Sequence, residues 1–165
     1  MGSRHVDGLY KVAHVRPHHS WQLSRLFAAA LEKDFAYYSN DYLLATRRQN
    51  TVPRLALGSL RGNRLLLGLW FGRRLVGYLI GATRPESDCG DIFWLYVDPA
   101  HRGYGLGAAL LNDSVAWLRD KRCNTVELVT YDHAPFYERQ NFRVERMVKG
   151  FIGGQDVYIM RRSLT

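Results

Sequence analysis

The chain has few cysteines and no long apolar run, and each shortage excludes a class of protein. Its 165 residues include two cysteines, Cys89 and Cys123, which are too few for a disulfide framework or a metal site. The longest apolar run, at 65–71, is far shorter than the ~20 residues of a transmembrane helix. No signal-peptide pattern follows the N-terminus, so we expect a cytoplasmic protein without membrane contact. We also expect no bound metal.

Acidic residues are missing from the stretch 42–85, which carries eight arginines. The chain has 23 basic and 15 acidic residues, so the rest of it is balanced at 15 of each and the net charge of +8 lies in this stretch. Four acids follow without a basic residue among them: Glu86, Asp88, Asp91 and Asp98. The arginine stretch could line a partner or homodimer surface or be a solvated face, and we favour the solvated face.

Hydrophobic periodicity predicts one domain over residues 9–165. Residues 1–8 show no pattern, and we expect a flexible N-terminus or a remnant of cloning there. Strands are predicted at 9–15, 65–71, 75–82, 91–97, 126–130, 144–151 and 156–160, and helices at 23–31, 42–48, 105–120 and 135–141. The order β-α-α-β-β-β-α-β-α-β-β indicates an α/β (α+β) fold with a mixed, mostly antiparallel sheet of about seven strands and helices on both faces.

A glycine-rich loop between a predicted strand and a predicted helix carries the most informative chemistry. The strand ends near Val97, and residues 102–107 (Arg-Gly-Tyr-Gly-Leu-Gly) lead into the helix. Free backbone N–H groups and the dipole at a helix start favour an anion, and glycines let the backbone approach a phosphate closely. Arg102 adds a permanent positive charge. The sequence therefore predicts a cradle for a phosphate or pyrophosphate.

Two common phosphate motifs fit this loop poorly. Gly103, Gly105 and Ala108 match the dinucleotide fingerprint G-x-G-x-x-[GA], but five residues separate Val97 from the first glycine. In the fingerprint the strand runs directly into that glycine. The P-loop is excluded because no Gly-Lys-Ser/Thr sequence occurs.

The pattern Arg102-x-x-Gly105-x-Gly107 instead resembles the acetyl-CoA pyrophosphate loop of the GNAT superfamily of N-acetyltransferases. Residues 136–142 (Phe-Tyr-Glu-Arg-Gln-Asn-Phe) are similar to the family's Phe-Tyr-Glu-Lys-x-Gly-Phe segment, and the predicted element order also fits. Asn141 stands where the family usually has glycine. Asparagine is the next-best residue for a left-handed helix cap, so we expect the same backbone there.

The resemblance implies an acetyl-CoA-dependent N-acetyltransferase in which a primary amine attacks the thioester directly in a ternary complex. The backbone N–H of Val97 would stabilise the oxyanion, at the place where the sheet of the family splays. The residues implied to bind acetyl-CoA, the co-substrate, are Leu95, Val97, Arg102, Gly103, Tyr104, Gly105, Leu106, Gly107, Ala108 and Phe136.

Tyr137 and Asp91 are the candidate acid and base. The ordinary pKa of tyrosine, about 10, exceeds that of an alkyl thiol, about 8.5, so Tyr137 would hold a proton for the leaving thiolate unless it only packs. An alkyl ammonium with a pKa of about 10.4 must lose a proton before it attacks. Strand alternation predicts that Asp91 shares one face with Phe93, Leu95 and Val97. Asp91 could act directly, through water, or merely begin the strand.

Tyr37, Tyr38 and Phe93 are the candidate acceptor-binding residues, because the first two helices shape the acceptor pocket in similar proteins. Helix packing would explain both tyrosines equally well. Glu86 and Asp88 could attract a cationic acceptor or be solvated. The acceptor is left open between a small-molecule amine and a protein N-terminus or lysine. The alternatives to an enzyme are a non-catalytic acyl-CoA sensor and, less favoured, a basic nucleic-acid-binding module.

Overall fold

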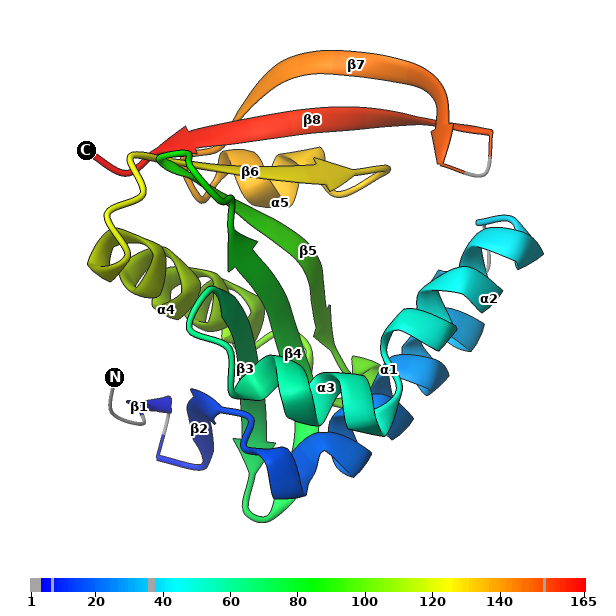
Figure 1. The fold of residues 1–165 in the computed structure, drawn as a ribbon, viewed down its shortest axis with the longest axis vertical. Helices are drawn as coiled ribbons and strands as arrows, with labels where there is room; N and C mark the ends of the chain where they lie inside the picture. Colours follow the sequence, from blue (N-terminus) through cyan, green and yellow to red (C-terminus); the bar gives the residue numbers. More distant parts are fainter. Residues whose placement is uncertain (1–3, 7, 36–37, 153) are drawn as a thin grey trace.

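The computed structural model describes residues 4–6, 8–35, 38–152 and 154–165. Its strands form one eight-stranded sheet in the order β1-β2-β3-β4-β5-β6-β8-β7 (Figure 1). All neighbouring strands are antiparallel except β5 and β6, which are parallel. The strands are β1 (Arg4–Val6), β2 (Tyr10–His14), β3 (Arg64–Phe71), β4 (Arg74–Thr83), β5 (Cys89–Val97), β6 (Thr125–Thr130), β7 (Arg143–Ile152) and β8 (Gln155–Ser163).

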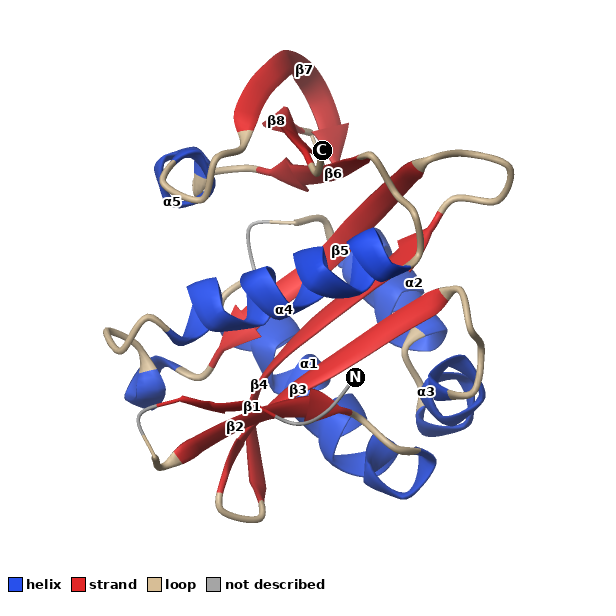
Figure 2. Cartoon of the chain, turned by 90° about the vertical axis from the view of Figure 1, so that its left-hand side faces the viewer, coloured by secondary structure: helices blue, strands red, loops and turns tan. Residues whose placement is uncertain are grey.

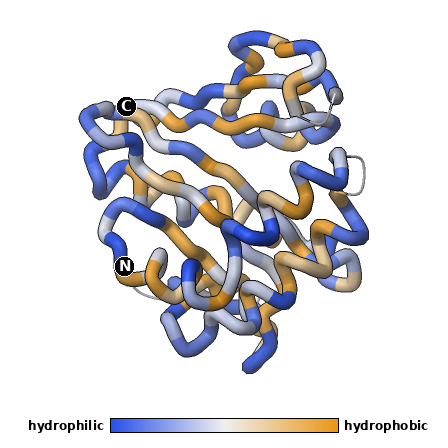
Figure 3. The backbone as a smooth tube through the Cα atoms, turned by 45° about the vertical axis from the view of Figure 1, so that its right-hand side comes forward, coloured by the Kyte–Doolittle hydropathy of each residue, from blue (hydrophilic) through white to orange (hydrophobic). Residues whose placement is uncertain are grey.

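Helices cover both faces of the sheet, as the sequence predicts. The helices are α1 (Ser20–Lys33), α2 (Asn40–Gln49), α3 (Val52–Ser59), α4 (Leu106–Asp120) and α5 (Ala134–Glu138), with 3-10 turns at Pro17–His19 and Pro99–His101. α4 packs on one face of β3, β4 and β5, and α1 and α3 pack on the other (Figure 2). The central strands are apolar almost throughout because both of their faces are buried (Figure 3).

Two short elements go beyond the prediction. The strand β1 lies within residues 1–8, where we expected no regular structure, and pairs with β2. The helix α3 follows directly on α2, in a segment without a predicted element. Pro53 stands in the first turn of α3, where the missing N–H of proline breaks no helical hydrogen bond. No helix in the described part of the chain is long and apolar enough to cross a membrane.

The sheet opens between β5 and β6, where the two strands diverge (Figure 1). Their parallel pairing joins only residues 89–92 of β5 to residues 125–128 of β6. Residues 94–97 of β5 remain paired with β4 on the other side, and residues 93–97 have no register with β6. One edge of this strand segment is therefore free.

A bulge in β5 makes the prediction about the Asp91 face wrong. Ile80 of β4 pairs with Trp94 and Gly81 pairs with Ile92, so Phe93 is an extra residue in the strand. Ile92 packs in the same apolar cluster as Leu95 and Val97, under α4. Asp91, the neighbour of Ile92, therefore points to the opposite face of the sheet, away from the face that Leu95 and Val97 share.

Candidate active site

A cleft of about 1090 Å³ lies where β5 and β6 diverge. Its walls come from β4, β5 and β6, from α2 and the α3 region, and from α5. Four of the residues predicted for the catalytic or acceptor site line it, together with Leu95 from the predicted cofactor set. The four are Tyr38, Asp91, Phe93 and Tyr137.

The free edge of β5 presents backbone groups on the side that β6 leaves. The N–H of Asp98 donates to the Val76 carbonyl of β4 at 2.8 Å. Because N–H groups alternate in direction along a strand, those of Leu95 and Val97 point away from β4. The Val97 carbonyl on the same side accepts a hydrogen bond from Arg102 Nε at 2.8 Å. An extended molecule with amide groups can add to such an edge as a further strand would.

The glycine-rich loop leaves the start of α4 open. Gly103 and Gly105 have φ of +91° and +68°, a region where a side chain would be strained. Gly105 caps α4 without a side-chain hydrogen bond, and Ala109 is the first residue of α4 whose N–H bonds back, to the Gly105 carbonyl. The N–H groups of residues 106–108 therefore lack intrahelical acceptors, which makes this end suitable for an anion.

The other predicted cofactor residues surround this helix start. Leu106, the first residue of α4, is buried in the apolar core, whereas Tyr104 is exposed beside the ring of Tyr10. The ring of Phe136 lies so close to Gly107 that a Cβ there would be 3.4 Å from it. Ala108 is partly buried.

The side chain of Arg102 turns toward the end of β5. Its Nε donates to the Val97 carbonyl, and Nη2 lies 3.3 Å from Asp34 Oδ1 at the end of α1. Its guanidinium carbon also stands 5.6 Å from the centre of the Tyr96 ring. The structure thus gives Arg102 a positioning contact with Val97, and its binding of pyrophosphate stays a prediction.

Tyr137 lines the cleft from α5 and is only 9% exposed. Its ring is held by Phe136 and Phe142, with centroid distances of 5.0 and 5.8 Å. Burial, and to a smaller degree the nearby Tyr38 phenol, raises the pKa of Tyr137 well above its ordinary value. The phenol therefore keeps its proton at neutral pH and can donate it to a leaving thiolate.

The turn after α5 confirms the expectation for Asn141, whose φ is +63°.

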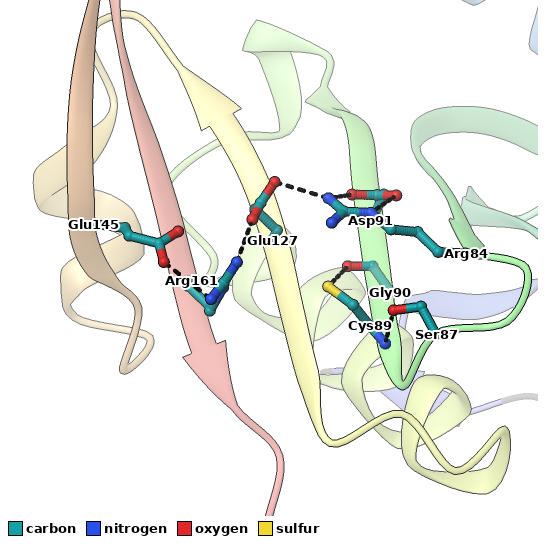
Figure 4. Close-up of polar contacts among 8 residues, drawn as sticks. All are labelled: Arg84, Ser87, Cys89, Gly90, Asp91, Glu127, Glu145 and Arg161. Carbon is teal, nitrogen blue, oxygen red and sulfur yellow. Dashed lines mark hydrogen bonds and ion pairs between the residues drawn. The ribbon is translucent and has the colours of Figure 1, made fainter.

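Asp91 is part of a chain of ion pairs that crosses three neighbouring strands to reach β7 (Figure 4). Arg84 Nε and Nη2 donate to the two carboxylate oxygens of Asp91 at 2.8 and 2.6 Å. Nη2 also donates to Glu127 Oε1 of β6 at 2.7 Å. Arg161 of β8 then joins Glu127 to Glu145 of β7. As a base, Asp91 would accept a proton on an oxygen that is already bonded to Arg84.

Arg84 and Glu127 are site residues that the sequence analysis missed. Both line the cleft beside Asp91. Burial alone would raise the pKa of Glu127, but hydrogen bonds from Arg161 and Arg84 outweigh burial and lower it below the ordinary value of 4.5. Asp91 faces Glu127 because the two are register partners in β5 and β6. No local pattern in the sequence contains that register.

The residues predicted to bind or attract the acceptor amine do not all lie in the cleft wall. Tyr38 stacks on Phe35 and contacts Tyr42 in the cleft wall, and Phe93 is 53% exposed at the bulge. Tyr37 lies outside the described residues. Glu86 and Asp88 do not belong to the cleft wall. Among the described residues, no group of three or more His, Cys, Asp or Glu side chains could hold a metal ion.

Comparisons with known proteins agree with this geometry. Residues 21–142 match the sequence model of the acetyltransferase (GNAT) family. A region of 69 residues is 41% identical to glucosamine 6-phosphate N-acetyltransferase of Trypanosoma brucei brucei, and it covers 41% of this chain and 47% of that enzyme. The chain thus matches about half the length of that curated relative.

Two solved structures illustrate the fold. PaiA N-acetyltransferase of Thermoplasma acidophilum, in complex with coenzyme A, aligns with a TM-score of 0.77 at 18% identity over 93% of this chain and 98% of that one. Ribosomal-protein-S5-alanine acetyltransferase of Vibrio fischeri aligns with a TM-score of 0.79 at 11% identity over 99% and 97% of the two chains. At these identities the structural likeness concerns the fold alone. The family match covers most of the sequence, and the chain belongs to the GNAT family of acetyltransferases.

Proposed function

We propose that the chain transfers the acetyl group of acetyl-CoA to a primary amine within a ternary complex. The observation that carries this proposal is the free edge of β5, which lines the same cleft as the protonated phenol of Tyr137 as far as Leu95 and continues two residues further to Val97. Transfer of an acyl group from a thioester needs an oxyanion stabiliser and a proton donor for the leaving thiolate. The N–H groups on the edge would stabilise the oxyanion, and the phenol would donate the proton.

The described residues fit acetyl-CoA at two points. The pyrophosphate would lie at the open start of α4, where three N–H groups lack intrahelical partners. The amide-containing arm would lie along Leu95 and Val97, whose N–H groups point to the free edge. Acetyl-CoA supplies the activated acetyl group when it is bound.

The proposed roles follow from these positions. The N–H of Val97 donates to the thioester oxygen as the amine attacks the carbonyl carbon. The C–S bond breaks, Tyr137 gives its proton to the leaving thiolate, and the second proton of the attacking nitrogen restores the Tyr137 phenol. Before the attack, Asp91 takes the proton that the ammonium releases, and Arg84 holds the carboxylate in place. Arg102 fixes the end of β5 through the Val97 carbonyl.

The acceptor is a primary amine, on a small molecule or on a protein N-terminus or lysine. The relative named for glucosamine 6-phosphate favours testing amino sugars first, because its identity over the matched region is 41%. A non-catalytic acyl-CoA sensor would use the same cofactor contacts but would leave the amine unchanged.

An amine panel tests the proposal. Glucosamine, glucosamine 6-phosphate, polyamines and peptides with free N-termini are incubated with acetyl-CoA, and free thiol and acetylated product are measured. We expect stoichiometric thiol and product with at least one amine, and a higher melting temperature with acetyl-CoA. A rise in melting temperature without product from any amine would indicate a sensor. Asp91→Asn should lower kcat without weakening acetyl-CoA binding.

A further inference from the structure

The arginine-rich stretch 42–85 contributes directly to the cleft. Four of its eight arginines line the cavity, namely Arg54, Arg61, Arg64 and Arg84. Arg54 and Arg61 are exposed, so they line the cleft from its solvent-accessible side. Arg84 is balanced by Asp91 and Glu127, so it adds no unpaired charge. The other three arginines remain to be explained.

Arg54, Arg61 and Arg64 gather at the end of the cleft formed by α3 and the start of β3. Arg54 and Leu57 lie one helical turn apart on α3, and Arg61 follows just after the helix ends; all three residues line the cleft. Arg64 begins β3, and its stem crosses Gly58 of α3. A Cβ on Gly58 would lie 3.1 Å from Arg64 Cδ, so the close approach of helix and strand holds this side chain in place.

These three guanidinium groups make no ion pair in the described part of the chain. Asp91 and Glu127 are the two acids among the described residues that line the cleft, and both are already paired. The α3 end of the cleft therefore carries an excess of positive charge. Burial and the neighbouring Arg61 lower the pKa of Arg64, as expected for cations held close together in a partly dry place.

Two buried polar atoms at the same end also lack hydrogen-bond partners. Arg64 Nε is buried without an acceptor, and Asn50, which is 6% exposed, has an unpaired Oδ1. Both residues line the cleft. Buried polar groups are nearly always paired in folded proteins, so the Arg64 Nε donor favours an acceptor group nearby, whereas Asn50 Oδ1 is itself an acceptor and gives no support for an anion.

We propose that the acceptor is a small amine carrying an anionic group, a phosphate or a carboxylate, which Arg54, Arg61 and Arg64 bind at the α3 end of the cleft. This inference rests on the proposed function and specifies its substrate class. An anion balances the excess charge and accepts hydrogen bonds from the unpaired guanidinium groups. The amine end of the same molecule then points along the cleft toward Val97 and Tyr137.

Matched amines test the substrate class. O-phosphoethanolamine is compared with ethanolamine, and β-alanine with propylamine, by thiol release with acetyl-CoA. We expect kcat/KM to be at least about tenfold higher for the anionic member of one pair or both, and this preference to weaken as salt rises. The pair with the larger preference identifies phosphate or carboxylate. Equal rates within both pairs would overturn the inference and leave the acetyltransferase proposal intact.

Variants locate the anion contacts. Arg61→Gln and Arg64→Gln should each lower kcat/KM for the preferred anionic amine by about tenfold or more, with the neutral amine and the KM for acetyl-CoA unchanged. Arg64→Lys should recover part of the loss. Arg48→Gln is the control, since Arg48 carries the same charge in the same stretch but does not line the cleft. A loss of acetyl-CoA affinity instead would assign these arginines to the cofactor and overturn the inference.

Calorimetry separates this inference from the activity. O-phosphoethanolamine and β-alanine are titrated into the chain saturated with coenzyme A, at millimolar concentration. Binding of either anion by the wild type and its loss in Arg64→Gln would support the anion site even if no amine were acetylated. Absence of binding by both anions, or faster acetylation of an acidic peptide than of either small anionic amine, would overturn it.

Discussion

Replacing Tyr137 by phenylalanine removes one oxygen atom from the cleft and little else. The ring keeps its contacts with Phe136 and Phe142, so we expect the free energy of unfolding to change by less than about 1 kcal/mol. A well-placed general acid contributes about 10²–10⁴ to a rate, so kcat should fall by about 100-fold or more. Affinity for acetyl-CoA should be nearly unchanged, because the hydroxyl acts on the departing sulfur.

The pH dependence of the wild-type kcat is a second test of the acid role of Tyr137. Burial raises the pKa of Tyr137 above its ordinary value of 10, so the protonated form persists to higher pH than in a free tyrosine. The wild-type kcat should therefore show no alkaline decline from this group below about pH 10. The assay is thiol release at saturating acetyl-CoA and amine between pH 6 and about pH 10.

Tyr78 provides the matched control. It is fully buried outside the cleft, its pKa is also raised by burial, and its hydroxyl is without a hydrogen-bond partner in the described structure. Tyr78→Phe should leave kcat unchanged and stabilise the fold by about 1 kcal/mol, because it removes an unsatisfied buried group. If Tyr137→Phe kept kcat within about threefold of the wild type, or if Tyr78→Phe lost as much activity, the acid role would be refuted.

Three further predictions concern the fold and the cofactor. Gly105→Ala should cost about 1–2 kcal/mol in unfolding experiments because φ is +68°, and it should also weaken acetyl-CoA binding, whereas Gly72→Ala, at φ +58° in a distant turn, should cause only the destabilisation. Asn141→Gly should raise stability by up to about 1 kcal/mol in urea unfolding, since φ is +63°; a loss would contradict the strain argument. Because the pKa of Glu127 is lowered in the fold, the ionised Glu127 adds to the free energy of unfolding above about pH 4.5, and this contribution is lost as pH falls through the folded pKa. Glu127→Gln should therefore make the free energy of unfolding fall less steeply toward acid pH. An unchanged acid decline would contradict this.

Features with a local cause were predictable from the sequence. The amphipathic spacing of α1, the glycine turn between β3 and β4, and the loop before α4 all follow from residues close together in the chain. Asn141 adopts the left-handed conformation expected from its place at the end of α5. The GNAT resemblance, which rests on two such local motifs, agrees with the family match.

Features that depend on distant pairing were not predictable. The bulge at Phe93 arises from the register of β5 against β4, and it reverses the face on which Asp91 lies. Arg84 meets Glu127 across 43 positions of sequence, and Arg64 reaches the cleft because α3 packs beside it. A count of charges located the arginines in one stretch but could not show that half of them line the cleft.

The short pairing between β5 and β6 has a mechanical consequence. Four residue pairs join the half of the sheet that holds β1–β5 to the half that holds β6, β8 and β7. A sheet with so few pairs between its two halves bends most easily between β5 and β6. Arg84 bonds Asp91 on one side of the join and Glu127 on the other, and Asn124 bonds Asp88 across the same join, so side chains reinforce the short backbone pairing. Because Asp91, Glu127 and Arg84 all line the cleft, the contact that holds Asp91 in place also ties β5 to β6 there.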